Sequence, residues 1–260
     1  VWSGKLRELP VLNRAQAAAY EGLHEFLERP TPEAALLCGV TGSGKTSVYI
    51  HLISDTLRSG KSAILLVPEI ALTPQMIRTF SEYFGNEVAI LHSSLSLGER
   101  YDEWKRIKNG DARLVIGTRS AVFAPFEDLG LIIIDEEQEE SYKSENSPRY
   151  HARDIAKYRC AKTNSLLLLG SATPDVESRY AAQTGKYVYF ELPERYNELH
   201  LPEVTIVDMK RELKSGNGSE LSSALRRELE ENIERGEQSI LFINRRGANK
   251  LICCGDCGYI

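Results

Sequence analysis

A glycine-rich segment with the residue types of a phosphate-binding loop follows a short apolar run. Residues 39–46 are Gly-Val-Thr-Gly-Ser-Gly-Lys-Thr and match G-x-x-x-x-G-K-[ST]. Backbone N–H groups of such a loop surround phosphate oxygens, and the next helix adds its partial positive charge. The lysine reaches the β- and γ-phosphates, and the hydroxyl after it holds Mg²⁺. We therefore expect a nucleoside triphosphate to bind here, through Gly39, Thr41, Gly42, Ser43, Gly44, Lys45 and Thr46.

An acidic pair closes the apolar run 131–134. Asp135 and Glu136 follow four aliphatic residues directly. An aspartate at a strand end beside a phosphate loop is the expected Mg²⁺ ligand, and a glutamate after it polarises the attacking water. The alternative is a solvated acidic turn, because Glu139 and Glu140 continue the run. The apolar run favours the first interpretation, in which Lys45, Asp135 and Glu136 are catalytic.

A third polar stretch, Ser171-Ala172-Thr173-Pro174, follows the apolar run 166–169. Its two hydroxyls are placed to bond the acidic cluster and to report its state to a bound polymer. The alternative is a helix start, with Thr173 as N-cap and Pro174 at the first helical position. The place of this stretch, after a third strand in chain order, supports the coupling role.

Gln16 admits two compatible interpretations. Asn13 and Gln16 have the spacing of a capping box, which alone explains the glutamine. A glutamine just upstream of a phosphate loop is also suited to contact an adenine edge, since its amide both donates and accepts.

Cations and aromatic rings gather in residues 141–162, although the chain as a whole is acidic. Rings that stack bases and cations that hold phosphates are typical of single-stranded nucleic-acid sites. For 157–162 we expect a solvated helix instead. Thr73 and Arg119 also follow strands and are weaker candidates for phosphate contacts. The candidates of the segment 142–153 for DNA contact are Tyr142, Lys143, Arg149, Tyr150, His151 and Arg153.

Composition limits the function classes. The net charge of −5 over 260 residues means that nucleic-acid binding needs a local basic patch. No apolar run approaches the roughly 20 residues of a membrane helix, so no membrane partner is expected. The five cysteines form no disulfide framework and fit a reducing cytoplasm. A start at Val1 and an end within a cysteine motif predict an excised fragment.

Cys254 and Cys257 form a Cys-x-x-Cys pair, which is half of a Cys₄ zinc site. Zinc needs four ligands, so we expect no stable metal in this chain alone and a Zn²⁺ site only in a full-length protein.

Short apolar strands alternate with helical segments, which predicts a parallel sheet covered on both faces. We expect strands at 35–38, 62–68, 87–91, 113–117, 131–134 and 166–169, and helices at 13–28, 45–57, 74–85, 97–108 and 150–162. Further strand-like stretches lie at 187–191, 203–208 and 239–244, with a helix at 222–235. The predicted domains are an α/β domain over 1–200, a connector over 201–236, and the truncated start of a second domain over 237–260.

Together these motifs resemble the helicase core of superfamily 2 and, in detail, the PriA family of bacterial replication-restart helicases. The Arg-Tyr-His-Ala-Arg-Asp segment, and Cys-x-x-Cys after Arg-Arg-Gly, separate that family from generic superfamily 2 proteins. The resemblance covers essentially the whole chain and rests on residues 39–46, 67–73, 117–121, 134–137, 149–154, 170–174 and 244–247.

The resemblance implies a three-layer RecA-like first motor lobe, with ATP and Mg²⁺ as cofactors. It implies 3′-to-5′ unwinding at stalled or branched forks, with single-stranded and forked DNA as partners. Single-stranded DNA-binding protein and primosome proteins are the other implied partners, in the bacterial cytoplasm at the nucleoid. Lys45 then binds phosphate, Thr46 and Asp135 hold Mg²⁺, Glu136 activates water, and the loop 141–154 couples DNA binding to hydrolysis.

Two departures from the family pattern alter these expectations. Gln138 stands where the family has histidine, and an amide does not titrate, so coupling through Gln138, Ser171 and Thr173 is expected to differ. From the resemblance we also expect the second motor lobe and its arginine finger, worth about 10³–10⁵ in rate, to lie outside this chain. We expect this chain to bind nucleotide and hydrolyse it poorly.

Two alternatives stay open. Another superfamily 2 translocase is the rival enzyme, and the cysteine motif argues against it. A nucleotide-switched scaffold that recognises forks and recruits partners is the rival from another class.

Overall fold

The computed structural model describes residues 4–28, 34–194 and 203–242. The chain divides into two compact units, Val1–Leu199 and His200–Ile260. No helix of the described residues is long and apolar enough to cross a membrane.

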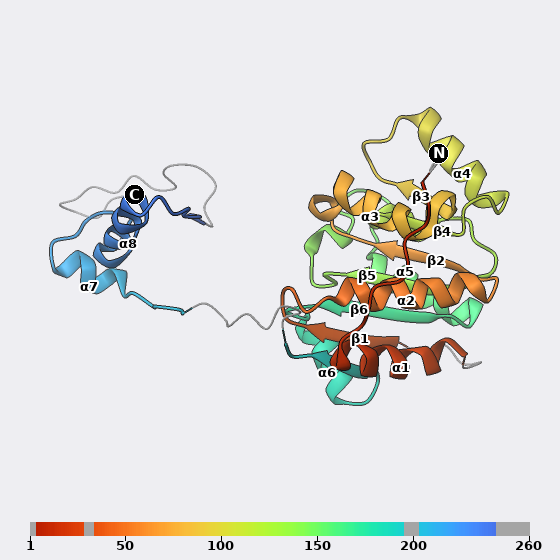
Figure 1. The fold of residues 1–260 in the computed structure, drawn as a ribbon, viewed down its shortest axis with the longest axis horizontal. Helices are drawn as coiled ribbons and strands as arrows, with labels where there is room; N and C mark the ends of the chain where they lie inside the picture. The colour runs from red at the N-terminus through yellow and green to blue at the C-terminus, as the bar shows by residue number, and fades with distance from the viewer. Residues whose placement is uncertain (1–3, 29–33, 195–202, 243–260) are drawn as a thin grey trace. The chain divides into compact units, whose positions relative to one another are not determined.

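The first unit is built on a seven-stranded sheet in the order β3-β4-β2-β5-β6-β1-β7 (Figure 1). All of its strand pairings are parallel. The strands are β1 (Ala34–Gly39), β2 (Ser62–Leu66), β3 (Val88–Leu91), β4 (Leu114–Gly117), β5 (Leu129–Asp135), β6 (Leu166–Ser171) and β7 (Val188–Leu192). The six strands expected before residue 170 are confirmed, and the stretch at 187–191 becomes the edge strand β7 beside β1.

Helices cover both faces of the sheet, as the predicted three-layer α/β fold requires. Neighbouring residues of a strand point to opposite faces, so Leu37 belongs to one buried cluster and Leu36 to the other. The first cluster includes residues of α1 (Arg14–Glu28), α2 (Lys45–Arg58) and α3 (Pro74–Phe84). The second includes residues of α4 (Leu97–Lys108) and α5 (Ala152–Thr163), and Ala182 of α6 (Val176–Gln183) packs against it.

The second unit contains α7 (Met209–Lys214) and α8 (Ser223–Glu234), of which only α8 was expected. The strand predicted at 203–208 is wrong, and residues 239–242 form no strand either. A strand needs a partner for its backbone hydrogen bonds, and the described residues of this unit offer none. Residues 243–244, and Cys254 and Cys257, lie outside the described residues.

Strand order explains how distant motifs meet. Strands β5, β6 and β1 are adjacent in the sheet. Because parallel strands end at the same edge, the segments that follow β1, β5 and β6 lie next to one another there. These are the phosphate loop, the acidic pair and the Ser171–Pro174 stretch, so the topology places the three motifs at one site.

Candidate nucleotide site and the adjoining basic loop

The phosphate loop has the backbone that its sequence predicts. Gly42 and Gly44 adopt left-handed conformations, with φ of 79° and 80°. A residue with a β-carbon would be strained in these conformations. Lys45 begins α2, and its Nζ donates a hydrogen bond of 3.1 Å to the Gly39 carbonyl. The buried Ser43 Oγ has no hydrogen-bond partner. The loop therefore presents backbone amides, a lysine and a spare hydroxyl, which is the donor set that a triphosphate needs.

The acidic pair faces this loop. Lys45 Nζ lies 3.7 Å from Glu136 Oε1. A cavity of about 470 Å³ is lined by Asp135, Glu136 and the loop residues Thr41 to Ser47. Thr46 and Asp135 thus offer a hydroxyl and a carboxylate to one space, and these oxygen ligands suit Mg²⁺. The residues present fit both the nucleotide and its metal.

Tyr49 is a functional neighbour that the sequence did not reveal. Its buried hydroxyl donates a 2.9 Å hydrogen bond to Asp135 Oδ1. Burial raises the pKa of Asp135, whereas the Tyr49 hydrogen bond and the charge of Lys45 act to lower it. A β-carbon at Gly170 would clash with the buried Tyr49 hydroxyl, so the packing at that position requires glycine. The available signal was the place of Tyr49, one helical turn beyond Lys45 on the same helix.

A line of side chains connects Glu136 to the end of β6. Gln138 Nε2 donates to Glu136 Oε2 at 2.9 Å, and Ser171 Oγ donates to Gln138 Oε1 at 2.6 Å. The Thr173 N–H donates to Ser171 Oγ at 2.9 Å. The three predicted coupling residues are therefore contiguous with Glu136. Thr173 does not cap a helix, because α6 begins at Val176 with Asp175 as its N-cap.

Glu136 itself has a left-handed backbone, with φ of 47°. This conformation is unfavourable for a residue with a β-carbon and occurs where surrounding contacts impose it, often at functional sites.

Gln16 makes the predicted capping box and braces the phosphate loop. The Asn13 N–H donates to Gln16 Oε1 at 2.9 Å, and the Gln16 N–H donates to Asn13 Oδ1 at 2.8 Å. Gln16 Nε2 donates to the Ser43 carbonyl at 2.8 Å, and the whole residue is buried. Contact with adenine stays a prediction.

Two residues expected to contact DNA point inward. Tyr142 is 1% exposed, and its hydroxyl donates a 2.6 Å hydrogen bond to the Asp135 carbonyl. Arg153 is 8% exposed and forms ion pairs with Glu137, Asp175 and Glu177. The expectation for these two residues is wrong, because the apolar body of Tyr142 and the paired guanidinium of Arg153 are taken up by the interior.

The other candidates of the loop lie at the surface. Lys143 and Arg149 are exposed, and Tyr150 and His151 are half-buried. The Tyr150 ring meets the exposed Phe123 edge-on, with 5.1 Å between ring centroids. Arg119 lies over the same ring and donates to the carbonyls of Ser141 and Lys143, which fixes the loop. The DNA contacts of Arg119 and of these four residues stay predictions.

His151 and Thr73 each have a local structural role. The His151 side chain caps α5 by accepting a hydrogen bond from the Arg153 N–H. Burial and the charge of Arg153 lower the pKa of His151. Thr73 is exposed and caps α3 by accepting from the Met76 N–H. The phosphate contact of Thr73 stays a prediction.

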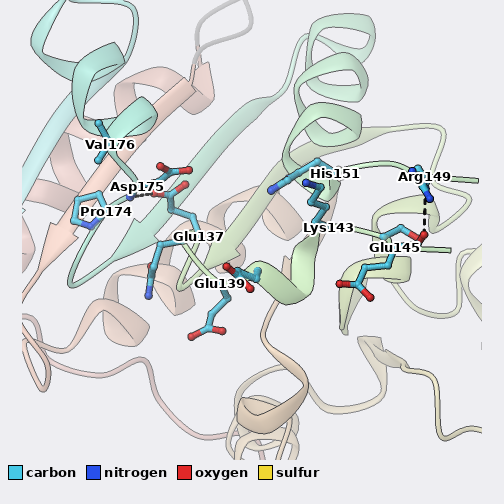
Figure 2. A pocket seen from close by; sticks show the side chains of 12 residues that line it. Glu137, Glu139, Lys143, Glu145, Arg149, His151, Pro174, Asp175 and Val176 are labelled. Atoms are coloured by element: carbon cyan, nitrogen blue, oxygen red, sulfur yellow. Dashed lines mark hydrogen bonds between the residues drawn. The ribbon is translucent and has the colours of Figure 1, made fainter. Parts of the chain in front are cut away.

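A second cavity, of about 870 Å³, adjoins the acidic segment (Figure 2). It is lined by Glu137, Glu139 and Asp175 on one side and by Lys143, Arg149 and His151 on the other. The basic loop, residues 141–154, and the segment after β5 thus line one cavity.

Comparison with known proteins decides the family. The model of the DEAD/DEAH box helicase family matches residues 13–181. This chain is a DEAD/DEAH box helicase family member. The match covers the phosphate loop, the acidic pair and the basic loop, so the helicase motifs and the geometry described above concern the same residues.

Relatives refine this placement among the helicases. The chain is 50% identical over 256 residues to replication restart protein PriA of Bacillus subtilis, covering 98% of this chain and 32% of that protein. It is 45% identical to PriA of Synechocystis, with 98% and 32% covered. The predicted resemblance to PriA is confirmed. This helicase chain spans about a third of the length of these relatives.

Solved helicase structures agree on the fold. A structure of RecG bound to a three-way DNA junction matches with a TM-score of 0.54 and 27% identity, over 71% of this chain and 24% of that one. The helicase domain of Pyrococcus furiosus Hef matches with a TM-score of 0.51 and 19% identity, over 70% of this chain and 38% of that one. The predicted RecA-like α/β fold is confirmed.

Proposed function

We propose that this chain is the ATP-binding lobe of a longer DNA helicase that restarts replication at stalled or branched forks. The 50% identity to replication restart protein PriA over 98% of the chain carries this proposal. The likeness to RecG, which was solved on a DNA junction, supports a branched DNA substrate. Unwinding with 3′-to-5′ polarity belongs to the same proposal.

The geometry supports a simple division of labour in hydrolysis. Lys45, at the start of α2, neutralises the terminal phosphates, and the loop amides hold their oxygens. Thr46 and Asp135 would hold Mg²⁺, which would neutralise charge on the phosphate oxygens. Glu136 accepts a proton from the attacking water or orients it, since it lies beside Lys45 and the cavity. Gln138 and Ser171 transmit the state of Glu136 to the end of β6.

Other parts of the proposal concern the longer protein. Cys254 and Cys257 supply half of a zinc site there. Single-stranded DNA-binding protein and primosome proteins are its partners, and the bacterial cytoplasm, at the nucleoid, is its location. The exposed cations Lys143 and Arg149 contact the DNA backbone in this proposal.

The test is steady-state ATP hydrolysis by the full-length protein without DNA, with linear single-stranded DNA and with forked DNA. We expect strong stimulation by DNA, greatest on the fork. Equal rates under the three conditions would overturn the proposed function, because the phosphate loop would then serve a reaction that DNA does not control.

A further inference from the structure

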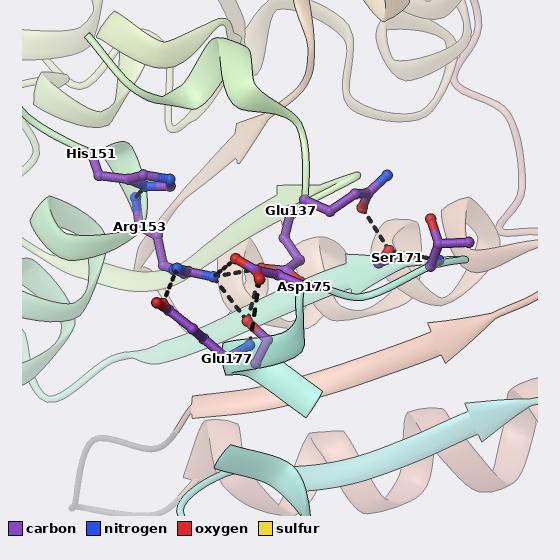
Figure 3. A network of polar contacts seen from close by, with 9 residues as sticks. Glu137, His151, Arg153, Ser171, Asp175 and Glu177 are labelled. Carbon is purple, nitrogen blue, oxygen red and sulfur yellow. Dashed lines mark hydrogen bonds and ion pairs between the residues drawn. The ribbon is translucent and has the colours of Figure 1, made fainter. Parts of the chain in front are cut away.

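A buried cluster around Arg153 joins three segments that are distant in sequence (Figure 3). From the start of α5, Arg153 Nη1 donates to Glu137 Oε2 at 3.0 Å, to Asp175 Oδ2 at 3.2 Å and to Ser178 Oγ at 2.9 Å. Its Nη2 donates to Glu177 Oε2 at 3.1 Å. One guanidinium thus ties α5 to the segment after β5 and to the start of α6.

Glu137 is the centre of this cluster. Its side chain is 0% exposed. Glu137 Oε1 accepts from the Asp175 N–H at 2.8 Å, and Oε2 accepts from Ser178 Oγ at 2.9 Å as well as from Arg153. The Glu137 N–H donates to the Gly170 carbonyl at 3.0 Å. Its backbone is therefore bound to the end of β6, and its side chain is bound to the segment that follows β6.

The two sequence neighbours of Glu137, Glu136 and Gln138, make their contacts toward the phosphate loop and Ser171. Glu136 lies against Lys45, and Gln138 bridges Glu136 to Ser171. Because Glu137 is fixed to Gly170 and Asp175, the stretch from Ser171 to Pro174 is held between two anchored points. The Ser171 hydroxyl is thereby kept within reach of Gln138, and Glu136 is kept in its left-handed conformation.

We propose that Arg153 and Glu137 are a positioning pair that sets Glu136 and Ser171 in the geometry for ATP hydrolysis. Neither residue lines the cavity at the phosphate loop, so each acts through its neighbours. The proposal rests on the proposed function, and it assigns to Arg153 a role inside the protein in place of a contact with DNA.

Burial makes the pair sensitive to change. A charge in the interior is tolerated only when it is paired and hydrogen-bonded, and removing one partner leaves the other uncompensated. Arg153→Met alone would therefore confuse a loss of positioning with a loss of folding. Arg153→Met combined with Glu137→Gln removes both charges, while the glutamine oxygen still accepts from the Asp175 N–H.

The test compares this double variant with the unchanged full-length protein at saturating single-stranded DNA. We expect kcat for ATP hydrolysis to fall by about 10- to 100-fold, the size of effect that a small displacement of a catalytic group produces. We expect the KM for ATP, the Kd for DNA and the Tm to change little. If the pair were purely structural, a double variant with a normal Tm would keep a normal kcat, and that result would overturn the proposal.

Arg106→Met with Glu103→Gln is the matched control. These residues form an Arg–Glu pair on α4 at 2.8 Å, and Arg106 also donates to the carbonyls of Asn86 and Val88. We expect kcat to stay within about twofold in this variant, as for a surface change away from the site. An equal loss in both double variants would overturn the proposal, because the effect would then follow from any lost ion pair.

Arg153→Lys gives a graded readout. An ammonium keeps the charge beside Glu137 but lacks the planar fork that reaches Asp175, Ser178 and Glu177 together. We expect a kcat between those of the unchanged protein and the double variant, and a value no higher than that of the double variant would count against a positioning role for the charge. If DNA did not stimulate hydrolysis by the unchanged protein, the proposed function and the positioning role would both be overturned. If DNA fully stimulated both the unchanged protein and the double variant, only the positioning role would be overturned.

Discussion

The phosphate loop and the basic loop differ in how closely sequence type determines side-chain placement. In the phosphate loop, each residue that the pattern singles out lies where the chemistry needs it, because glycine conformations and a helix start fix the backbone. In the basic loop, residues of similar type separate: Lys143 and Arg149 face outward, while Tyr142 and Arg153 face inward. A motif defined by backbone geometry thus predicts positions, whereas a composition bias predicts only a region.

The inward residues bring the two regions together. Tyr142 bonds the Asp135 carbonyl, and Arg153 bonds the Glu137 carboxylate, so the basic loop is fastened at both ends to the segment that carries Glu136. Its outward residues are thereby connected to the nucleotide site through two buried contacts.

The largest expected effect concerns the acidic pair. Glu136→Gln in the full-length protein should lower kcat for ATP hydrolysis by about 10²–10⁴-fold, the usual contribution of a positioned acid or base. ATP affinity, measured with a fluorescent nucleotide, should stay close to normal. Glu139→Gln is the control, since Glu139 belongs to the same acidic run. Little loss in either variant would return the segment to the interpretation of a solvated acidic turn, and equal large losses would show that the effect is not specific to Glu136.

Next in size is the cost of breaking the buried ion pair. Arg153→Met should lower the free energy of unfolding by about 3–5 kcal/mol, because Glu137 is left buried and uncompensated. Arg149→Met, an exposed change of the same type in the same loop, should cost less than about 0.5 kcal/mol. Urea unfolding of the chain measures both. Equal costs would remove the distinction between inward and outward residues.

The fold and the main site were predictable because their signals are local or periodic. The apolar runs of β1, β2 and β6 predict buried parallel strands, and Gly39 to Thr46 predicts the phosphate loop. The wrong strand at 203–208 shows the limit, because a strand also needs a partner that sequence does not show. Tyr49 and Glu137 were missed for a similar reason: their partners, Asp135 and Arg153, come from other elements.

A smaller effect should separate the outward cations. Lys143→Ala with Arg149→Ala should weaken single-stranded DNA binding and reduce the slope of log K against log salt by about 0.7 for each cation removed. The measurement is fluorescence anisotropy at several salt concentrations. Lys157→Ala with Lys162→Ala, on the helix interpreted as solvated, is the control. An unchanged slope for the first pair would show that the loop does not contact the phosphate backbone.

The smallest effect concerns Tyr49. The Tyr49 hydrogen bond stabilises the Asp135 carboxylate and so lowers a pKa that burial has raised. Tyr49→Phe removes that hydrogen bond, so the pKa of Asp135 rises further. Since Mg²⁺ needs the carboxylate form, the acid limb of the pH profile of kcat/KM should move to higher pH. A limb that stays in place or moves to lower pH would show that Asp135 does not set it.

One titration tests the division of the basic loop most directly. ATP hydrolysis by the full-length protein is followed against single-stranded DNA concentration for the Lys143→Ala, Arg149→Ala variant and for the Arg153→Met, Glu137→Gln variant. The outward variant should need more DNA for half-maximal stimulation and reach nearly the normal plateau. The inward variant should reach half-maximal stimulation at the normal DNA concentration with a plateau about tenfold lower or less. If both variants changed the same parameter, the outward and the inward residues would share one role and the account would be wrong.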